Sequence, residues 1–472
     1  MNLTDLNQEI EDQFPAISRG LAAGYVGGIY HAGETVTHAA GIANLNTGAP
    51  MTTDTRWVLG SITKVLVASM ILRLVDQGRI DLDRRVVDYL PEFRLKVDGM
   101  AEAILVRHLL DHTNGIDADT LYPPREFGPR AVQSYVEALG STGLLFEPGT
   151  FTHYSNPGYA LAGRILERLE GVTFNEAIER DLYGPLGMTE SCTSAEQAIL
   201  HRTAVGAHYD AAAGGLKATS MFMLPVASAA TGTTPIVTAA DLLRFGRMHL
   251  AGGKAENGAT YLSADSTARM QKVSFDLGVP NSAPTGLGWR RVPIAGTTAL
   301  FHSGGSPGGS STLSVFPEHE LIITGFASGP GGLLVHDGVL ALVLKALLGR
   351  DVEAPFARGA PPRDLSAFAG EYASFQSSMS ITAAGETLHC QPRSHPIDED
   401  HRRVALGYLG TLATPAFSLE PLNETLFKPA GAPDELFHGI MGRQALTSFH
   451  RPDAGGRYGF RHSGWRAMPR VG

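Results

Sequence analysis

Ser61 and Lys64 stand three residues apart in Ser61-Ile62-Thr63-Lys64, a spacing that can support nucleophilic catalysis. On a helix, residues three apart lie on one face, one turn from each other. A serine hydroxyl is a weak nucleophile until a neighbouring base takes its proton. A lysine can be that base where burial and polar neighbours hold its amine neutral. Taken alone, the pair is better explained as a helix N-cap serine and a solvated lysine. The signal becomes specific because Tyr154-Ser155-Asn156 and His302-Ser303-Gly304 follow in that order.

The residues around Ser61 predict that it lies at the start of a helix. Trp57 to Gly60 form a short apolar strand that ends in glycine. Gly78 is a stop signal after a run of apolar residues at helical spacing: Val65, Leu66, Met70, Ile71, Leu74 and Val75. Backbone N–H groups at a helix N-terminus point at negative charge. Charge that develops on a substrate attacked by Ser61 would therefore be stabilised.

With these motifs in hand, the chain resembles the serine β-lactamase and penicillin-binding-protein superfamily, whose motifs read S-x-x-K, Y-x-N and K/H-x-G. The resemblance covers roughly the first three quarters of the chain. It includes accessory signatures at 109–115, at 148–150, at Tyr159 and at 286–289.

The resemblance also implies roles for individual residues. Lys64 would take the proton of Ser61, and Tyr154 would relay a proton between the leaving group and the incoming nucleophile. Asn156 and His302 would orient the substrate. The backbone N–H groups of Ser61 and Gly305 would hold the oxyanion, and Gly304 is a candidate for substrate contact.

Each of these residues also has a purely structural interpretation. Tyr154 could be a core aromatic residue, Asn156 could fix a turn, and His302 could be a hydrogen-bonded core histidine. The order of the motifs favours the catalytic interpretation.

Two further patterns compete with this assignment. Ser306 in Gly304-Gly305-Ser306-Pro307-Gly308 fits the nucleophile elbow G-x-S-x-G, but an elbow must lead straight into a helix. The sequence Pro307-Gly308-Gly309 opposes a helix there. His108 and His112 are one helical turn apart and could bind a metal with Asp111. They lie in an accessory signature, which favours a structural role, so we expect neither a metal nor a cofactor.

Hydrophobic periodicity predicts a mixed α/β (α+β) fold for this part of the chain. Leu3, Leu6, Ile10 and Phe14 share one face of an N-terminal helix. Strands over 24–31 and 35–43 form a hairpin, helices dominate from Ser61 to about His249, and further strands are expected near 287–291, 298–302, 311–316 and 321–326. We expect strands from both ends to share one antiparallel, β-lactamase/transpeptidase-like sheet flanked by helices, with a helical lobe between them.

A chain of 472 residues exceeds the size at which one core stops growing, so two domains are expected. A proline-containing linker at 351–362 would separate a catalytic domain at 1–350 from a domain at 363–472. Short strand-like runs with turn residues between them predict a small lipocalin-like β-barrel there, at 368–372, 379–381, 387–390, 416–419, 435–440 and 445–449.

Composition and the N-terminal residues limit which partners and which cellular location can be expected for the protein. The net charge of −9 argues against nucleic acid and against an anionic membrane. The two cysteines, Cys192 and Cys390, do not indicate a disulfide framework. Residues 1–24 have neither the basic start nor the apolar stretch of a secretory signal, so we expect a cytoplasmic protein.

Within the superfamily, a cytoplasmic chain with one C-terminal barrel is most similar to the stand-alone penicillin-binding-protein-type thioesterases of nonribosomal peptide synthesis, the surugamide cyclase type. Such enzymes take a linear peptide from a peptidyl carrier protein or pantetheine thioester and close it head to tail, with a D-residue at the acyl terminus. A D-stereospecific peptidase or esterase, or a β-lactamase-like hydrolase, fits nearly as well. A non-catalytic peptide sensor fits less well, because all five motif residues are present.

Two regions are further candidates for substrate contact. The uncharged stretch 218–235, which includes Phe222, suits a pocket wall, although a buried loop is about equally expected. Arg443, at an expected hairpin turn of the barrel, could reach the substrate, although a solvent-exposed arginine is the simpler interpretation. We expect the barrel to favour ring closure over hydrolysis without affecting acylation of Ser61.

Overall fold

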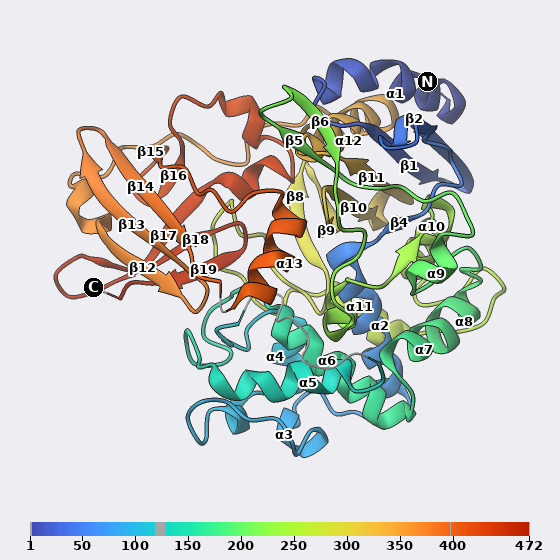
Figure 1. The fold of residues 1–472 in the computed structure, drawn as a ribbon, viewed down its shortest axis with the longest axis horizontal. Coiled ribbons are helices and arrows are strands. Elements are labelled where there is room, and N and C mark those ends of the chain that lie inside the picture. The colour runs from blue at the N-terminus through green and yellow to red at the C-terminus, as the bar shows by residue number, and fades with distance from the viewer. Residues whose placement is uncertain (1, 119–127, 397, 472) are drawn as a thin grey trace.

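The computed structural model describes residues 2–118, 128–396 and 398–471. Its larger domain is built on a seven-stranded antiparallel sheet in the order β3-β2-β1-β11-β10-β9-β8 (Figure 1). The N-terminal strands are β1 (Gly24–His31), β2 (Glu34–Asn44) and β3 (Ala49–Pro50), and the C-terminal strands are β8 (Arg290–Ile294), β9 (Thr297–Ser306), β10 (Gly309–Phe316) and β11 (Leu321–Ser328). The predicted sheet, shared by both ends of the domain, is confirmed.

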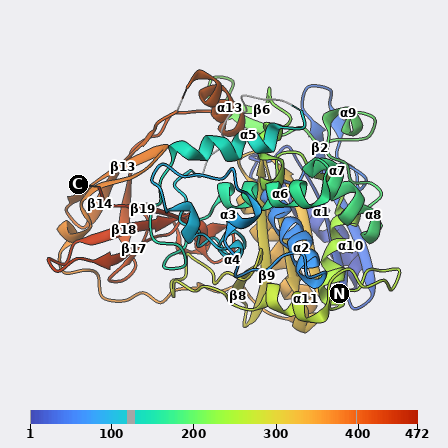
Figure 2. The ribbon, with the colours of Figure 1, turned by 90° about the horizontal axis from the view of Figure 1, so that it is seen from below.

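Alternation along the strands gives the sheet two apolar faces. Ile29 and Ile323 pack with helices α1 (Leu3–Ser18) and α12 (Gly332–Leu348). Val26 and Ile322 belong instead to the core on the opposite face, which includes α10 (Ala239–Leu250). The sheet is therefore a layer between two sets of helices, as Figures 1 and 2 show.

The helical lobe lies between β4 (Trp57–Val58) and α10 in the sequence. Its main helices are α2 (Thr63–Asp76), α4 (Val106–Leu110), α5 (Ala131–Ala138), α6 (Asn156–Glu170) and α7 (Phe174–Ile178), with shorter α3 (Val86–Tyr89), α8 (Gly184–Leu186) and α9 (Ala195–Ala198), and α11 (Ala264–Gln271) follows α10. Two small sheets interrupt it, formed by β4 with β7 (Ile236–Val237) and by β5 (Ala207–Asp210) with β6 (Gly215–Ala218). The hairpin of β5 and β6 was not predicted.

The second domain is a nearly closed eight-stranded antiparallel barrel, in agreement with the lipocalin-like prediction. Its strands are β12 (Gly370–Ser374), β13 (Ser377–Ala384), β14 (Thr387–Ser394), β15 (Phe417–Pro421), β16 (Leu426–Pro429), β17 (Thr447–Pro452), β18 (Tyr458–Ser463) and β19 (Arg466–Pro469). A bridge from Tyr372 to Arg470 brings the first and last strands together. Aromatic rings fill the interior, with Phe368 against Tyr458 at 4.5 Å and against Phe449 at 4.9 Å.

Two details of the barrel differ from the sequence prediction. The strand expected at 435–440 is wrong, because the helical turn η8 (Asp434–Phe437) begins that segment. Between β14 and β15 the chain forms an unpredicted helix, α13 (Glu399–Leu409). Asp398 caps its N-terminus by accepting from the N–H of His401 at 2.8 Å, and Gly410 ends it with φ 76°.

The remaining sequence expectations concern the segments outside these elements. Between the end of α12 at Leu348 and the next element, which begins at Leu365, the chain forms neither helix nor strand. This segment contains the expected linker at 351–362. Cys192 and Cys390 are both free and buried. None of the described helices combines the length and apolar character needed to cross a bilayer.

Candidate active site

Ser61 and Lys64 lie in contact, as the motif predicts. Ser61 is in the helical turn η1 (Gly60–Ile62) that leads into α2. Lys64, on the first turn of α2, is fully buried, and its Nζ donates to Ser61 Oγ at 3.0 Å and to the carbonyl of Thr231 at 2.8 Å. The amine therefore lies at hydrogen-bonding distance from the hydroxyl oxygen whose proton it would accept.

The turn that carries Ser61 is pressed against β9 by two glycines. Gly60 has φ +67°, and a methyl group there would lie 2.6 Å from the N of Gly305. A methyl group on Gly304 would collide with the carbonyl of Leu59 and lie 3.1 Å from the N of Ser61. Ser311 fastens the turn by donating to Leu59 O at 2.7 Å. This packing places the backbone of Gly305 beside the turn that carries Ser61, so the amides of these two residues stay the candidates for an oxyanion hole.

Tyr154 completes the contacts around the lysine. Lys64 Nζ lies 4.8 Å from the centre of the Tyr154 ring. Tyr154 also packs against His112, with ring centres 4.8 Å apart, and its ring centre lies 6.3 Å from that of His302. The structure thus brings Ser61, Lys64, Tyr154 and His302 into one cluster.

The accessory signature at 109–115 holds the Tyr-Ser-Asn motif in place. Ser155 caps α6 by accepting from Gly158 N at 3.1 Å, and its hydroxyl donates to Asn114 Oδ1 at 3.0 Å. Its N–H donates to His112 Nδ1 at 3.1 Å. Asn156, half-buried, is consequently the first residue of α6. His108 also has a structural contact, accepting from Leu105 N at 3.2 Å.

His302 is held neutral in this cluster. Its Nδ1 donates to Ser303 O at 2.7 Å, which leaves Nε2 as an acceptor. Burial is the largest cause that lowers the pKa of His302, to about 3. The imidazole is therefore uncharged at neutral pH and suits orientation of a donor better than electrostatic attraction.

The barrel meets this site through residues that sequence reasoning did not single out. The carbonyl of Trp465 accepts from Tyr154 N at 2.8 Å. The guanidinium of Arg466 lies 5.0 Å from the centre of the Tyr154 ring, and that of the buried Arg290 lies 4.0 Å from the ring of Trp465. Gly464-Trp465-Arg466 carries no periodic or motif signal. Only the fold shows that it meets Tyr154.

Arg443 is not at a hairpin turn as expected. It lies in the helical turn η9 (Gly442–Ala445) and is buried. Its guanidinium donates to the carbonyls of Gly439, Pro293 and His438 at 3.1, 3.0 and 2.9 Å. Pro293 belongs to β8, so these contacts join the two domains. They favour a structural role for Arg443 over contact with substrate.

The uncharged stretch 218–235 meets the site at one end. Thr231 accepts from Lys64, and a methyl group on Gly232 would lie 2.8 Å from the N of Ser61. Phe222 instead packs on a small apolar cluster with Val58 and Ile236. The segment therefore contacts the nucleophile through its backbone.

The structure does not support the two competing patterns, the nucleophile elbow at Ser306 and a metal site. Ser306 ends β9, and the chain turns at once into β10, so it is not on a strand-to-helix elbow. Among the described residues no group of histidine, cysteine and carboxylate side chains could hold a metal ion.

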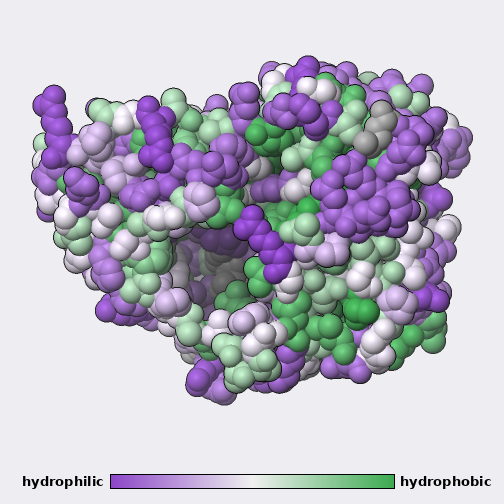
Figure 3. Space-filling model, turned by 90° about the horizontal axis from the view of Figure 1, so that it is seen from above, coloured by the Kyte–Doolittle hydropathy of each residue, from purple (hydrophilic) through white to green (hydrophobic). Residues whose placement is uncertain are grey.

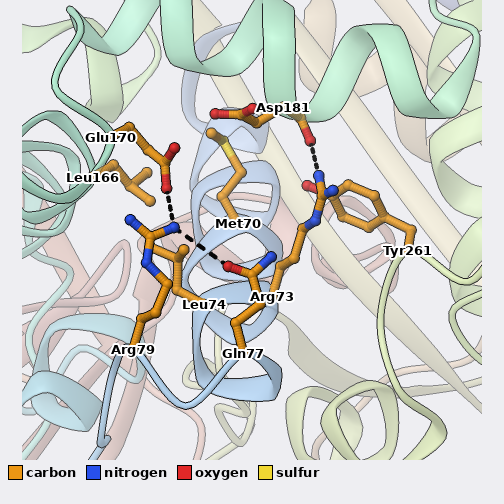
Figure 4. Close-up of a pocket in the computed structure, with 9 residues that line it drawn as sticks. All are labelled: Met70, Arg73, Leu74, Gln77, Arg79, Leu166, Glu170, Asp181 and Tyr261. Carbon is orange, nitrogen blue, oxygen red and sulfur yellow. Dashed lines mark hydrogen bonds and ion pairs between the residues drawn. The ribbon is translucent and has the colours of Figure 1, made fainter.

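A pocket at the far end of α2 is lined by Arg73, Arg79 and Glu170 (Figure 4). Arg79 pairs with Glu170 at 2.6 Å, and Arg73 donates to the carbonyl of Asp181 at 2.5 Å, which indicates a structural role.

Comparison with known proteins agrees with this geometry. The family model named Beta-lactamase matches residues 8–347. The chain belongs to this family. It is 34% identical over 340 residues to penicillin-binding protein 4 of Amycolatopsis lactamdurans, covering 71% of this chain and 88% of the relative. Membership implies a serine hydrolase or acyltransferase of the penicillin-binding-protein type.

Solved structures with the same fold include SurE and a D-amino acid amidase. SurE matches all of this chain and all of its own with a TM-score of 0.76 and 23% identity, and it has also been solved with D-Leu. The D-amino acid amidase of Ochrobactrum anthropi matches 74% of this chain and 99% of its own, with a TM-score of 0.62 and 22% identity. The match to SurE therefore includes the barrel.

Proposed function

We propose that the protein is a peptide cyclase that takes a peptidyl thioester onto Ser61 and releases the peptide by head-to-tail closure. The thiol partner would be the pantetheine arm of a peptidyl carrier protein. A D-residue at the acyl terminus is the natural candidate, since SurE was solved with D-Leu and a related fold is a D-amino acid amidase.

The chemistry uses two acyl transfers. Lys64 takes the proton of Ser61 as Oγ bonds to the acyl carbon, the C–S bond breaks, and the thiol leaves with a proton supplied through Tyr154. The peptide's amine then bonds to the same carbon, the ester C–O bond breaks, and the amine's proton returns to Ser61 through Tyr154 and Lys64. The backbone N–H groups of Ser61 and Gly305 would stabilise the oxyanion in both steps, each such donor contributing about 3 kcal/mol.

The observation that carries the proposal is the contact of the barrel with Tyr154. Ring closure competes with hydrolysis of the same ester, so the amine must be held close and water kept away. The barrel lies against the residue that would relay the amine's proton, through Trp465 and Arg466. Figure 3 shows the surface hollowed between the barrel and the catalytic domain, where a folded-back peptide would have room. Arg466, exposed and beside the Tyr154 ring, could bind a carbonyl or carboxylate of the peptide.

A peptidyl N-acetylcysteamine thioester with a D-residue at the acyl terminus tests the proposal. We expect a cyclic product lighter than the linear acid by one water, and none with Ser61→Ala. Loading the same peptide on a carrier protein should raise kcat/KM if a carrier is the donor. Linear acid as the sole product with both donors would make the protein a D-stereospecific peptidase or esterase instead.

A further inference from the structure

Helix α13 belongs to the barrel by sequence but packs on the catalytic domain. Figure 1 shows it between the barrel strands and β9. His208 Nε2 and Thr219 Oγ1 both donate to the carbonyl of Gly407, at 3.2 and 3.3 Å. A methyl group on Gly407 would meet the side chain of Met221, the closest atom at 2.6 Å. The C-terminal end of α13 is thereby fixed beside the hairpin of β5 and β6.

This docking brings Tyr408 to the strand that borders Ser61. A methyl group on Gly305 would collide with the Tyr408 hydroxyl, so the hydroxyl covers the side-chain position of Gly305. Gly304 faces the turn of Ser61 instead. Because successive strand residues point to opposite faces, Tyr408 covers the face of β9 that points away from that turn.

The same part of β9 has an edge with which no described strand pairs. β8 pairs with β9 only as far as Phe301, and beyond it β9 pairs with β10 alone. An extended acyl chain bound to Ser61 would run along this edge, a common mode of peptide binding. A side chain next to Gly305 would then meet the ring of Tyr408.

We propose that Tyr408 is a specificity-determining residue that limits the size of the side chain on the acyl-terminal residue. The inference rests on acyl transfer to Ser61 as proposed above. Tyr408 is half-buried and lies on a helix end held by His208, Thr219 and Met221, so its ring forms a fixed wall. The occupant is the side chain of a peptide residue, apolar or aromatic in character to suit a phenol ring.

The test compares p-nitrophenyl esters of N-acetyl-D-alanine and N-acetyl-D-phenylalanine. Tyr408→Ala should raise the ratio of kcat/KM for the phenylalanine over the alanine ester by about tenfold, the scale on which pocket size discriminates between side chains. Tyr408→Phe keeps the ring and should leave the ratio within threefold of the wild type. Leu409→Ala, an exposed neighbour on α13, is the matched control and should behave likewise.

A ratio for Tyr408→Ala within threefold of the wild type, or a lower one, overturns the assignment, and any larger rise supports it. Thermal unfolding midpoints establish that each variant is folded, and Tyr408→Leu offers a smaller step should the alanine variant fail to fold. The blocked esters cannot cyclise, so the outcome is independent of ring closure. Failure of the proposed function would appear separately, as linear acid from the peptidyl thioester.

Discussion

At the scale of residues, the arrangement around Ser61 separates it from the other serine that fits a nucleophile motif. Ser61 has a buried amine at 3.0 Å and a helix behind it, whereas Ser306 ends a strand that turns directly into another strand. The chemistry therefore depends on neighbours that the motif alone does not specify. His302 shows the same dependence, since burial makes it a neutral acceptor.

Ser61→Ala should abolish turnover and covalent labelling by a fluorophosphonate while the protein stays folded. The loss in kcat should be at least about 10⁴-fold, because the nucleophile cannot be replaced by its neighbours. Ser306→Ala is the control and should keep both properties. Mass spectrometry of the labelled peptide locates the adduct, and an adduct on the Ser61→Ala protein would refute the assignment.

Lys64 and Tyr154 should act as one unit, because the amine lies over the phenol ring. In the proposed mechanism both residues transfer the proton that leaves and returns to Ser61. We expect Lys64→Ala and Tyr154→Phe each to lower kcat/KM by about 10³-fold or more. The kcat/KM of the double variant should be only slightly below that of the less active single variant. Steady-state kinetics on one ester measures this, with the exposed Tyr209→Phe as control. Losses that multiply in the double variant would mean independent roles.

At the scale of elements, the site is formed by close contact between the turn η1 and strand β9. Gly304 faces the carbonyl of Leu59, so the strand and the turn touch through their backbones. The spacing between the two expected oxyanion donors is therefore set by a contact that has no room for a side chain.

Gly304→Ala should displace the turn and reduce kcat about 100-fold, the scale of losing one oxyanion donor. Gly140→Ala is a matched control, because a methyl group there meets nothing within 4 Å. Burst kinetics on an activated ester reports acylation directly. Wild-type acylation by the Gly304→Ala protein would show that the turn can move without cost to the chemistry.

Local patterns predicted the elements of the catalytic domain well. Alternating and helical periodicity gave α1, the first hairpin and the strands from β9 to β11, and the motif order indicated the cluster around Ser61. Contacts between distant segments had no local signal. Trp465 meets Tyr154 across more than half of the chain, and Arg443 is buried at the domain seam because Pro293 and Gly439 offer it carbonyls.

Helix α13 is an intermediate case. Asp398 and Gly410 are recognisable capping residues, so a search for caps could have found the helix. Its contact with Gly305 could not have been predicted, because the docking depends on His208 and Met221 in the other domain.

At the scale of the whole molecule, both the barrel and the catalytic domain contribute contacts to the candidate active site. Ala467 N donates to His153 Nδ1 at 3.0 Å, and Trp465 accepts from Tyr154. Removing the barrel would therefore disturb Tyr154 as well, contrary to the expectation that acylation is independent of it. Point variants such as Arg466→Ala test product choice more cleanly than truncation.

Buried histidines make the protein sensitive to acid. Burial lowers the pKa to about 3 for His38, His249 and His302 and to about 4 for His108, His336 and His450. Between these values and the ordinary 6.5 the unfolded chain binds more protons, so the free energy of unfolding decreases as pH falls from about 6.5 to about 4.

We expect the urea midpoint to fall steeply over that range, with a total loss of several kcal/mol. His38→Gln should make the slope shallower, and the exposed His201→Gln should leave it unchanged. Equal slopes for all three proteins would mean that His38 does not contribute to acid sensitivity.

Asp337 on α12 should act in the opposite direction, at the seam between the domains. Its carboxylate accepts from the N–H groups of Met441 and Gly442 at 3.0 and 2.8 Å, and its burial raises the pKa from the ordinary 3.8 to about 6. In that window the folded protein binds more protons than the unfolded chain, so this group lowers the free energy of unfolding as pH rises, by up to about 3 kcal/mol.

Asp337→Asn removes the titration, and its stability relative to the wild type should improve by that amount between pH 4 and pH 7. Urea unfolding across this range measures the difference, with the exposed Asp351→Asn as control for the loss of one charge. A difference between wild type and Asp337→Asn that stays constant over the range would show that the carboxylate keeps its charge throughout and that the seam is indifferent to pH.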